Sequence, residues 1–352
     1  MAALSSDPDP AAGGVPEPKR KGGRRRLVLR SLKAAIAVVL LAVLVLRIGW
    51  QDIASSFASL AWWWIPGLVA VRLVGLFLQS LRWKLYLDSH GIEASPFRLF
   101  RYSWVSRFFS NFLPGQTGGD LSRVLYGWDE TVKKSKLASS VIMDRVVGFL
   151  GLLLVAAVAG LTHLDLVEQV NLGLWPWAAA AGALVLTVLI TMRAPTIWAQ
   201  HLARRVPGAA LRSKVAGVLR DLAVHNEHWG RLLGGVLLSA GFYVVAAVHT
   251  WLAFLAFGVH LDFVGVLVVV PLVTMIMAVP ITVNGWGVAE AVKVVLYVQL
   301  GATGAEAFAV ALLGRFTLTL IGATGGVIYL LTPGRRPANR ERRGWLFGPG
   351  TT

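Results

Sequence analysis

The sequence has no cysteine in its 352 residues and is poor in charged, above all acidic, side chains. Without cysteine the chain forms no disulfide bond and no thiolate metal site. Charged residues make up 15% of the chain, with 18 acidic residues against 34 lysines and arginines. Walker loops, the Gly-x-Ser-x-Gly nucleophile motif and the dinucleotide-binding fingerprint are also missing. These absences argue against a nucleotide-driven pump and give no sign of a cofactor.

The sequence is rich in long apolar runs. Hydrophobic residues make up 56% of the chain, and several runs exceed the roughly 20 residues that cross a bilayer as a helix. We therefore predict an all-α, polytopic membrane protein with about seven to eight transmembrane helices and additional Gly/Pro-broken re-entrant segments. The net charge is +16, and the basic residues lie beside the apolar runs. There they are better explained by orientation of the protein in the membrane and by contact with anionic lipid than by binding of nucleic acid.

Charge also divides the chain. Residues 1–30 are predicted to be a disordered basic N-terminus, 31–331 the membrane domain, and 332–352 a basic tail. Lysine and arginine crowd both ends and the regions 82–136 and 193–231, whereas the loops 51–59, 162–172, 258–262 and 301–304 have none. By the positive-inside rule, this pattern predicts a multi-pass protein of the cell (inner or plasma) membrane with both termini cytoplasmic.

The apolar spans are expected at about 31–50, 62–87, 137–161, 173–192, 232–257, 263–280 and 305–331. The segment 286–300 is shorter and is compatible with a full crossing or with a re-entrant segment. Residues 96–112 mix aromatic, arginine and serine side chains. This mixture is typical of an interfacial helix, or of one arm of a re-entrant hairpin that spans residues 96–127. Arg82, near the end of the second span, is expected to snorkel to the cytoplasmic interface.

Two apolar stretches are interrupted by proline and glycine at corresponding places in two halves. The interrupting residues are Pro114, Gly118, Gly119, Pro280, Gly285 and Gly287. A broken backbone in apolar surroundings must line a cavity or be buried in protein, because lipid leaves its polar groups unpaired. Such paired interruptions indicate a binding site near the middle of the membrane.

Each break is followed by an acid and then, at the same distance along the chain in both halves, by an arginine. The acids of the two halves are 170 residues apart (290 − 120), and the same offset separates the two arginines and one further pair of basic residues. These pairs are Asp120 and Glu290, Arg145 and Arg315, and Arg123 and Lys293. The spacing predicts an inverted repeat with halves of about 60–192 and 232–331, joined by a cytoplasmic segment, 193–231.

The charged residues near the breaks form the candidate site. Each charge at the bilayer centre costs about 2.5–3.5 kcal/mol, so these groups must pair or face water. In a structural interpretation, Glu290 pairs with Arg315, and Asp120 or Asp144 pairs with Arg145. In a functional one, arginines and helix N-termini bind an anionic phosphate group in a polar cavity. The candidate substrate-binding residues are Arg82, Arg107, Asn111, Asp120, Arg123, Asp144, Arg145, Glu290, Lys293 and Arg315.

Signals for metal or catalysis are weak. His225 and His228 flank Glu227, but they lack the metalloprotease spacing and an evident third ligand. We predict neither a metal site nor a catalytic residue.

Taken together, the motifs resemble a known family. They are Arg82-Trp83, Asn111-x-x-Pro114-x-x-x-Gly118-Gly119-Asp120-x-x-Arg123, Asp144-Arg145 and Pro280-x-x-x-x-Gly285-x-Gly287-x-x-Glu290. Over roughly 30–331 the chain is similar to the flippase-like membrane domain of lysylphosphatidylglycerol synthases and to stand-alone membrane proteins like it. Asp144 departs from the pattern, in which a glutamate is expected before the arginine. Because the sequence ends at Thr352, we expect no soluble synthase domain and no aminoacyl transfer.

The resemblance implies a lipid flippase-like transporter that moves an anionic or zwitterionic headgroup between leaflets. The headgroup would belong to a phospholipid or a polyprenyl-phosphate-linked sugar. A membrane transferase acting on a lipid phosphate, with Asp120 or Glu290 as base, remains an alternative. So does a non-transporting accessory subunit of envelope-lipid synthesis. The expected partners are membrane lipids with anionic headgroups, and an enzyme that makes the lipid would be a separate chain.

Overall fold

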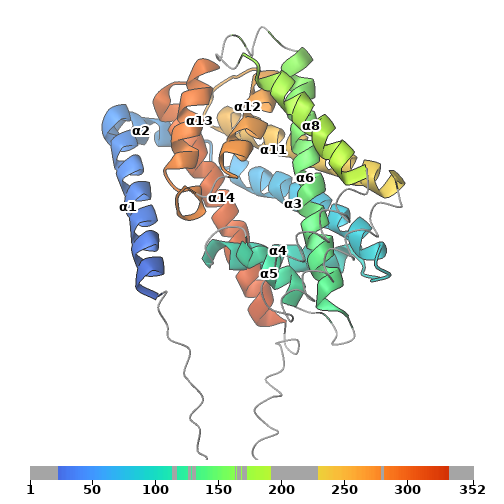
Figure 1. Ribbon diagram of the computed structural model, residues 1–352. Helices are drawn as coiled ribbons and strands as arrows, with labels where there is room; N and C mark the ends of the chain where they lie inside the picture. The colour runs from blue at the N-terminus through green and yellow to red at the C-terminus, as the bar shows by residue number, and fades with distance from the viewer. Residues whose placement is uncertain are drawn as a thin grey trace, which may run out of the picture.

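The computed structural model describes residues 23–112, 117–125, 128, 132–162, 164, 168, 173–191, 229–278 and 281–332. These residues are overwhelmingly helical (Figure 1). The helices are α1 (Gly23–Ile48), α2 (Trp50–Ala58), α3 (Trp64–Asp88), α4 (Pro96–Phe112), α5 (Thr117–Leu125), α6 (Lys134–Thr162), α8 (Trp175–Thr191), α11 (Trp229–Ala256), α12 (Phe263–Ile276), the short 3-10 turn η2 (Val283–Gly285), α13 (Val288–Gln299) and α14 (Gly304–Leu331). The prediction of an all-α polytopic membrane protein is confirmed. The segment 193–228 lies outside the described residues.

Five helices in the described part are long and apolar enough to cross a bilayer. They cover Ser31–Ile48, Trp64–Asp88, Lys134–Thr162, Gly230–Ala256 and Gly304–Leu331. The other two predicted spans correspond to shorter helices, namely α8 with 17 residues and α12 with 14, and the segment 286–300, whose crossing was left open, forms α13 with 12. At 1.5 Å per residue, α13 is about 18 Å long, well short of the roughly 30 Å hydrocarbon core. This length makes α13 a partial segment rather than a full crossing.

Helix ends follow local capping rules. Pro96 opens α4, where its missing N–H costs no hydrogen bond. Asp262 caps α12 by accepting a 2.7 Å hydrogen bond from the Gly265 N–H. Thr303 and Glu306 form a reciprocal capping box at the start of α14.

The segment 51–59 was expected to be a loop, and this is wrong. It forms α2, a short helix that follows α1 after Gly49. Its Ile53 is buried, and Phe57 packs edge-to-face on Phe257. Apolar contacts on one face of α2 therefore stabilise this helix. The absence of lysine and arginine in 51–59 indicated its side of the membrane and not its secondary structure.

The helices of the two halves follow each other at nearly constant intervals along the chain. α3 and α11 begin at Trp64 and Trp229, and α4 and α12 at Pro96 and Phe263. α5 and α13 begin at Thr117 and Val288, and α6 and α14 at Lys134 and Gly304. Four consecutive helices of the first half thus have counterparts of the same order in the second, whereas the described residues hold no counterpart for α8. These intervals agree with the predicted repeat and extend it from single residues to whole helices.

The two halves are also arranged with opposite directions. α6 begins at the bottom of the molecule and runs upwards, whereas α14 begins at the top and runs downwards (Figure 1). The pair α4 and α5 lies towards the bottom, and the pair α12 and α13 lies towards the top. The described start of α1 and the end of α14 are both at the lower side. An inverted repeat produces this arrangement.

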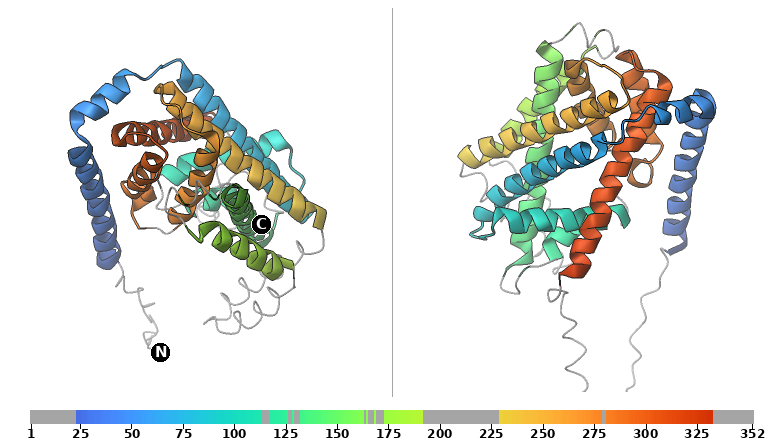
Figure 2. Two further views of the ribbon diagram at one scale, coloured as in Figure 1. Left: turned by 90° about the horizontal axis from the view of Figure 1, so that it is seen from above. Right: turned by 180° about the vertical axis from the view of Figure 1, so that it is seen from behind.

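The halves meet along α3 and α11, which pack side by side (Figure 2, right). A methyl group placed on Gly75 would lie 3.5 Å from Val245, and one placed on Gly241 would lie 3.6 Å from Leu78. Residue numbers increase along α3 as they decrease along α11 at these contacts, so the two helices are antiparallel. Gly75 and Val245 are themselves related by the offset that relates Asp120 to Glu290, so the approximate two-fold axis of the repeat passes close to this contact.

Each half of the repeat contains an apolar core. The first joins α3, α4 and α6, through Trp83, Leu99, Tyr102, Val105, Leu137 and Val141. The second joins α11, α12, α13 and α14 with the start of α3, through Leu68, Phe254, Val269, Tyr297, Ala309 and Leu313. The charged residues of the candidate site lie on the same helices, in separate clusters described below.

Candidate functional site: two charged clusters in the membrane domain

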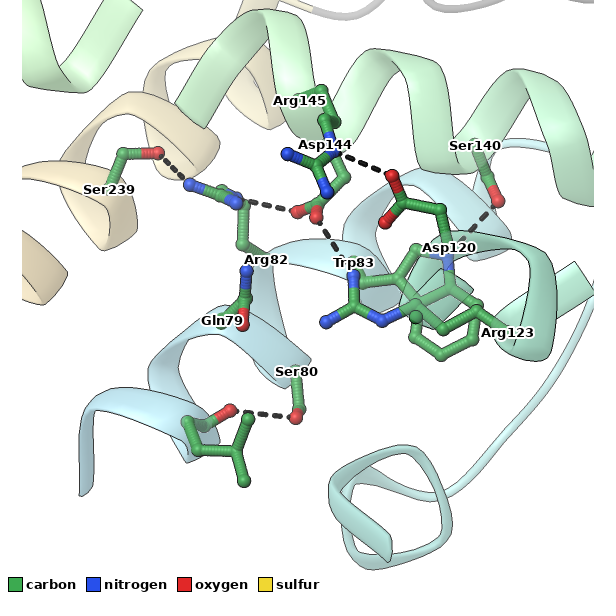
Figure 3. Close-up of polar contacts among 12 residues, drawn as sticks. Gln79, Ser80, Arg82, Trp83, Asp120, Arg123, Ser140, Asp144, Arg145 and Ser239 are labelled. Atoms are coloured by element: carbon green, nitrogen blue, oxygen red, sulfur yellow. Dashed lines mark hydrogen bonds and ion pairs between the residues drawn. The ribbon is translucent and has the colours of Figure 1, made fainter. Parts of the chain in front are cut away.

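Asp144 is the centre of a buried charged cluster in the first half (Figure 3). Its Oδ1 atom accepts a 2.6 Å hydrogen bond from Arg82 Nε, and its Oδ2 atom accepts a 3.2 Å bond from Arg123 Nη1. Arg82 also donates to Ser239 Oγ on α11 at 2.8 Å, and the Arg123 guanidinium lies over the Trp83 ring. The side chains of Asp144, Arg82 and Arg123 are only 2%, 6% and 4% exposed. One carboxylate thus holds two guanidinium groups from α3 and α5 against α6.

Arg82 does not snorkel to the interface as expected. Its side chain is buried and ion-paired with Asp144. A guanidinium with a carboxylate at 2.6 Å gains more from this charge-assisted bond than from reaching towards solvent. Its position ties α3 to α6 and, through Ser239, to α11 of the other half.

Asp120 and Arg145 form a second, more exposed ion pair (Figure 3). Arg145 Nε donates to Asp120 Oδ2 at 2.7 Å, and the side chains of Arg145 and Asp120 are 44% and 25% exposed. Asp120 lies in the first turn of α5, where a negative charge is favoured by the helix dipole. The sequence left open whether Asp120 or Asp144 pairs with Arg145, and the observed ion pair is with Asp120. An exposed pair on these helices is tolerable only beside water.

The corresponding pair of the second half is more buried. Arg315 donates to Glu290 Oε1 from Nη2 at 2.6 Å and from Nε at 3.0 Å. Glu290 Oε2 accepts a 2.7 Å bond from the Gly287 N–H and so caps α13. The predicted pairing of Glu290 with Arg315 is confirmed.

Arg315 also fixes the broken backbone before α13. It donates to the carbonyl oxygens of Asn284 at 2.9 Å and of Gly285 at 3.4 Å, and its guanidinium lies over the Trp286 ring at 4.3 Å. Asn284 and the two glycines, Gly285 and Gly287, have positive φ angles of 51°, 72° and 80°. Carbonyls released by the break are thus satisfied by Arg315, as buried backbone groups must be. Most of its donors are already engaged, so Arg315 serves as a clamp on the break.

Glycines allow close approach at both breaks. A methyl group on Gly119 would lie 2.8 Å from Ser106 Oγ and still closer to Ser110 Oγ, so α5 packs tightly on α4. A methyl group on Gly287 would lie 2.8 Å from the Ala37 carbonyl oxygen of α1. Substitution with any larger residue would therefore separate these elements.

The second break contacts the end of α4, the helix that precedes the first break, through an asparagine. Asn284 Nδ2 donates to the Asn111 carbonyl oxygen, at the end of α4, at 3.3 Å. Arg107, one turn earlier on α4, donates to Gln79 Oε1 at 2.5 Å and interacts electrostatically with Arg72, Arg123 and others. The end of α4 therefore lies between the charged clusters of the two halves.

Three cations of this network have no carboxylate within 4.0 Å in the described part of the chain. They are Arg72, Arg107 and Lys293. Arg72 bonds neutral groups, with Nε donating to His249 Nε2 at 3.0 Å and to Thr317 Oγ1 at 2.9 Å, and Nη2 to the Gly314 carbonyl at 2.9 Å. Lys293 lies near enough to Arg72, Glu290 and Arg315 for electrostatic interaction.

The predicted site residues thus separate into groups. Asp144, Arg82 and Arg123 form the buried triad, and the acid after each break pairs with the arginine 25 residues further along the chain. Gly118 lies buried at the start of α5. Pro114 and Pro280 lie outside the described residues, as do the histidines at 225 and 228. Arg72, Gln79, His249 and Thr317 join the network without having been among the predicted site residues. The position of Arg72 deep inside the apolar run of α3 is the sequence signal that could have identified it.

Residues 30–326 match the family model described as the lysylphosphatidylglycerol synthase TM region. The chain belongs to this family. The match covers well over half of the sequence and includes nearly all of both halves of the repeat, both breaks and all the charged residues of the two clusters. The resemblance seen in the motifs is thereby confirmed.

Curated relatives are distant but nearly full-length. A UPF0104 membrane protein of Methanothermobacter thermautotrophicus is 22% identical over 316 residues, which is 82% of this chain and 91% of that protein. A UPF0104 membrane protein of Pyrococcus horikoshii is 21% identical over 296 residues, or 74% and 85% of the two chains. A second Methanothermobacter protein of the same name is 22% identical over 339 residues, or 87% and 94%. These names give a location in the membrane and state no activity.

Proposed function

We propose that this protein is a lipid flippase-like transporter that moves an anionic or zwitterionic headgroup between the leaflets of the cell membrane. The headgroup passes through a polar cavity formed where the two inverted halves meet, while the acyl chains remain in the bilayer. A phospholipid and a polyprenyl-phosphate-linked sugar both carry the required phosphate. Both termini face the cytoplasm in this proposal, because the basic residues flank the spans on that side.

The observation that carries the proposal is a surplus of positive charge inside the helical bundle. Seven cations face three carboxylates in the described network, which leaves four positive charges in excess. The residues are Arg72, Arg82, Arg107, Arg123, Arg145, Lys293 and Arg315 against Asp120, Asp144 and Glu290. Burying unpaired charge is costly. A transported anion supplies the missing negative charge, whereas a purely structural network would be expected to balance itself.

Some charged residues of the network hold the fold together, and others are available to bind a transported anion. The cations of the Asp144 triad and of the Arg315 clamp already have carboxylate partners, and they hold the helices and the second break in place. Arg72, Arg107 and Lys293 pair with no acid of the described chain and remain available to a phosphate. Arg107 lies between the two clusters, so it is placed to pass an anion from one half to the other. The exposed pair of Asp120 and Arg145 would open onto the hydrated entrance.

A leaflet-exchange assay in liposomes tests the proposal. Purified protein is reconstituted with a fluorescent phospholipid, and a membrane-impermeant reductant reports the fraction exposed outside. We expect wild-type protein to expose the inner-leaflet label within the assay and Arg107→Gln to slow this strongly. Phe97→Leu, at an exposed aromatic residue at the start of α4, serves as the control variant and should exchange at the wild-type rate.

Two results would contradict transport. If wild-type liposomes behave like protein-free liposomes with every phospholipid and polyprenyl phosphate tried, the protein does not exchange lipid alone. If mass spectrometry instead shows a new lipid product in these liposomes, the chain is a transferase.

A further inference from the structure

The two halves of the repeat differ in charge at the position of Asp144. Asp144 of α6 and Gly314 of α14 are related by the same offset as the acids and arginines and occupy equivalent places in the repeat. Each directly precedes the arginine that pairs with the acid after the break. In the first half this position carries a carboxylate, and in the second it carries no side chain.

Two cations converge on Gly314, as two converge on Asp144. A methyl group placed on Gly314 would lie 3.3 Å from Arg72 Nη2 and 4.0 Å from Lys293 Nζ. Lys293 of α13 is the counterpart of Arg123 of α5, which binds Asp144 in the first half. Arg72 comes from α3 of the other half. The second half thus keeps a pair of cations around this position but lacks the carboxylate between them.

The described surroundings of Arg72 and Lys293 do not replace this carboxylate. Arg72 is held by His249, Thr317 and the Gly314 carbonyl, all neutral acceptors. In the described part of the chain neither cation has a carboxylate within 4.0 Å. Glu290, which interacts electrostatically with Lys293, is engaged by Arg315 and by the cap of α13. Two like charges this close in a low-dielectric interior repel unless an anion lies between them.

We infer that Arg72 and Lys293 bind an oxyanion beside Gly314, in the place that the Asp144 carboxylate fills in the first half. The ligand is a phosphate or carboxylate group, because the arginine presents a planar donor pair and the lysine a point charge. Its role as the headgroup site rests on the proposed transport function, whereas binding of the anion does not. The asymmetry makes one half a fixed, internally neutralised site and the other a site for an external anion.

The substitution Gly314→Asp tests this directly, because it supplies the missing carboxylate from the protein itself. Beyond its own helix, the added Cβ would meet the flexible ends of Arg72 and Lys293, so the side chain can be accommodated. Gly314→Asn adds the same volume without the charge and is the matched control. The full-length variants are purified in a neutral detergent, and thermal unfolding is recorded with increasing phosphatidylglycerol, inorganic phosphate or diacylglycerol.

Wild-type protein and Gly314→Asn should be stabilised by phosphatidylglycerol with similar midpoints, and neither by diacylglycerol. Gly314→Asp should unfold at an equal or higher temperature without lipid and need at least tenfold more phosphatidylglycerol for the same shift. Stabilisation by inorganic phosphate alone would identify a free anion rather than a headgroup as the ligand. If Gly314→Asp responds to phosphatidylglycerol as wild type does, the inference is wrong.

Two further results separate this inference from the proposed function. Lys293→Gln should also lose the phosphatidylglycerol response, which keeps the test decisive if Gly314→Asp does not fold. A normal response by this variant overturns the inference. If wild type binds the anion as expected but does not exchange lipid, the site stands and transport fails. If lipid exchange is unaffected by Gly314→Asp, transport stands and the role of this site in moving the headgroup is wrong.

Discussion

Replacing Asp144 with asparagine gives the sharpest test of the buried triad. Asp144→Asn keeps the shape of the side chain and removes its charge. Arg82 and Arg123 then lose their shared carboxylate, although both side chains are about as buried as Asp144 itself. Breaking a buried ion pair by removing one partner costs about 3–5 kcal/mol, because the remaining charge is left uncompensated. At about 2 °C per kcal/mol for a large chain, the unfolding temperature should fall by about 6–10 °C.

The matched control is Asp120→Asn, which removes the carboxylate of the exposed pair. Its partner Arg145 is 44% exposed, so solvent replaces the lost interaction. An exposed ion pair contributes about 0–1 kcal/mol, which corresponds to a shift within about 2 °C. Heating both variants in detergent and measuring the remaining monodisperse protein by size-exclusion chromatography gives the comparison.

A compensating change sharpens the test further. Adding Arg123→Gln to Asp144→Asn removes one of the two orphaned charges, so part of the lost stability should return. Equal shifts for Asp144→Asn and Asp120→Asn would refute the distinction between a buried structural triad and a hydrated pair. So would an unchanged unfolding temperature for Asp144→Asn.

Three further predictions concern the Arg315 clamp, the glycine at the second break and the topology of 96–127. Arg315→Lys should lower stability by about 2 kcal/mol, since lysine cannot bond the carboxylate and both backbone carbonyls together; an unchanged unfolding temperature would contradict the clamp. Gly287→Ala should cost about 2 kcal/mol or more because φ is +80° and α1 lies in contact, whereas Gly67→Ala, with open space around it, should not destabilise. Single cysteines at Arg98 and Lys134 should react with an impermeant maleimide only from the cytoplasm, and labelling of either from outside would make 96–127 a true crossing.

Much of the charge pairing could be predicted from spacing alone. In each half the acid lies on the short helix after the break, and the arginine lies 25 residues further on, in the next long helix. Because this separation is the same in both halves, acid and arginine meet in each. The positions of Asp120 and Glu290 near helix N-termini followed from the Pro/Gly interruptions before them. The lengths of α6 and α14 followed from uninterrupted apolar sequence.

The partners of Asp144 could not be predicted in this way. Adjacent residues on a helix point about 100° apart, so Asp144 and Arg145 face different neighbours. Sequence does not tell which of them faces α3. Asp144 turns towards Arg82, and Arg145 towards Asp120.

The polar contacts of Arg72 were also out of reach. They come from α11 and α14, 177 and 245 residues away, and both are neutral. No charge pattern signals a contact of this kind. Likewise, the sequence left open whether 286–300 crosses the membrane, because hydropathy does not register the Gly287 cap and the turn after Gln299 that limit α13 to 12 residues.

The central claim is that cations without acidic partners in the described network select a lipid anion for transport. The most direct measurement compares wild-type exchange rates, in the liposome assay, for lipids that share acyl chains and differ in the charge and phosphate content of the headgroup. We predict that anionic phosphate-bearing lipids exchange fastest, zwitterionic lipids more slowly, and lipids with a cationic headgroup and no phosphate at the protein-free rate. Equal rates for cationic and anionic headgroups would contradict the account.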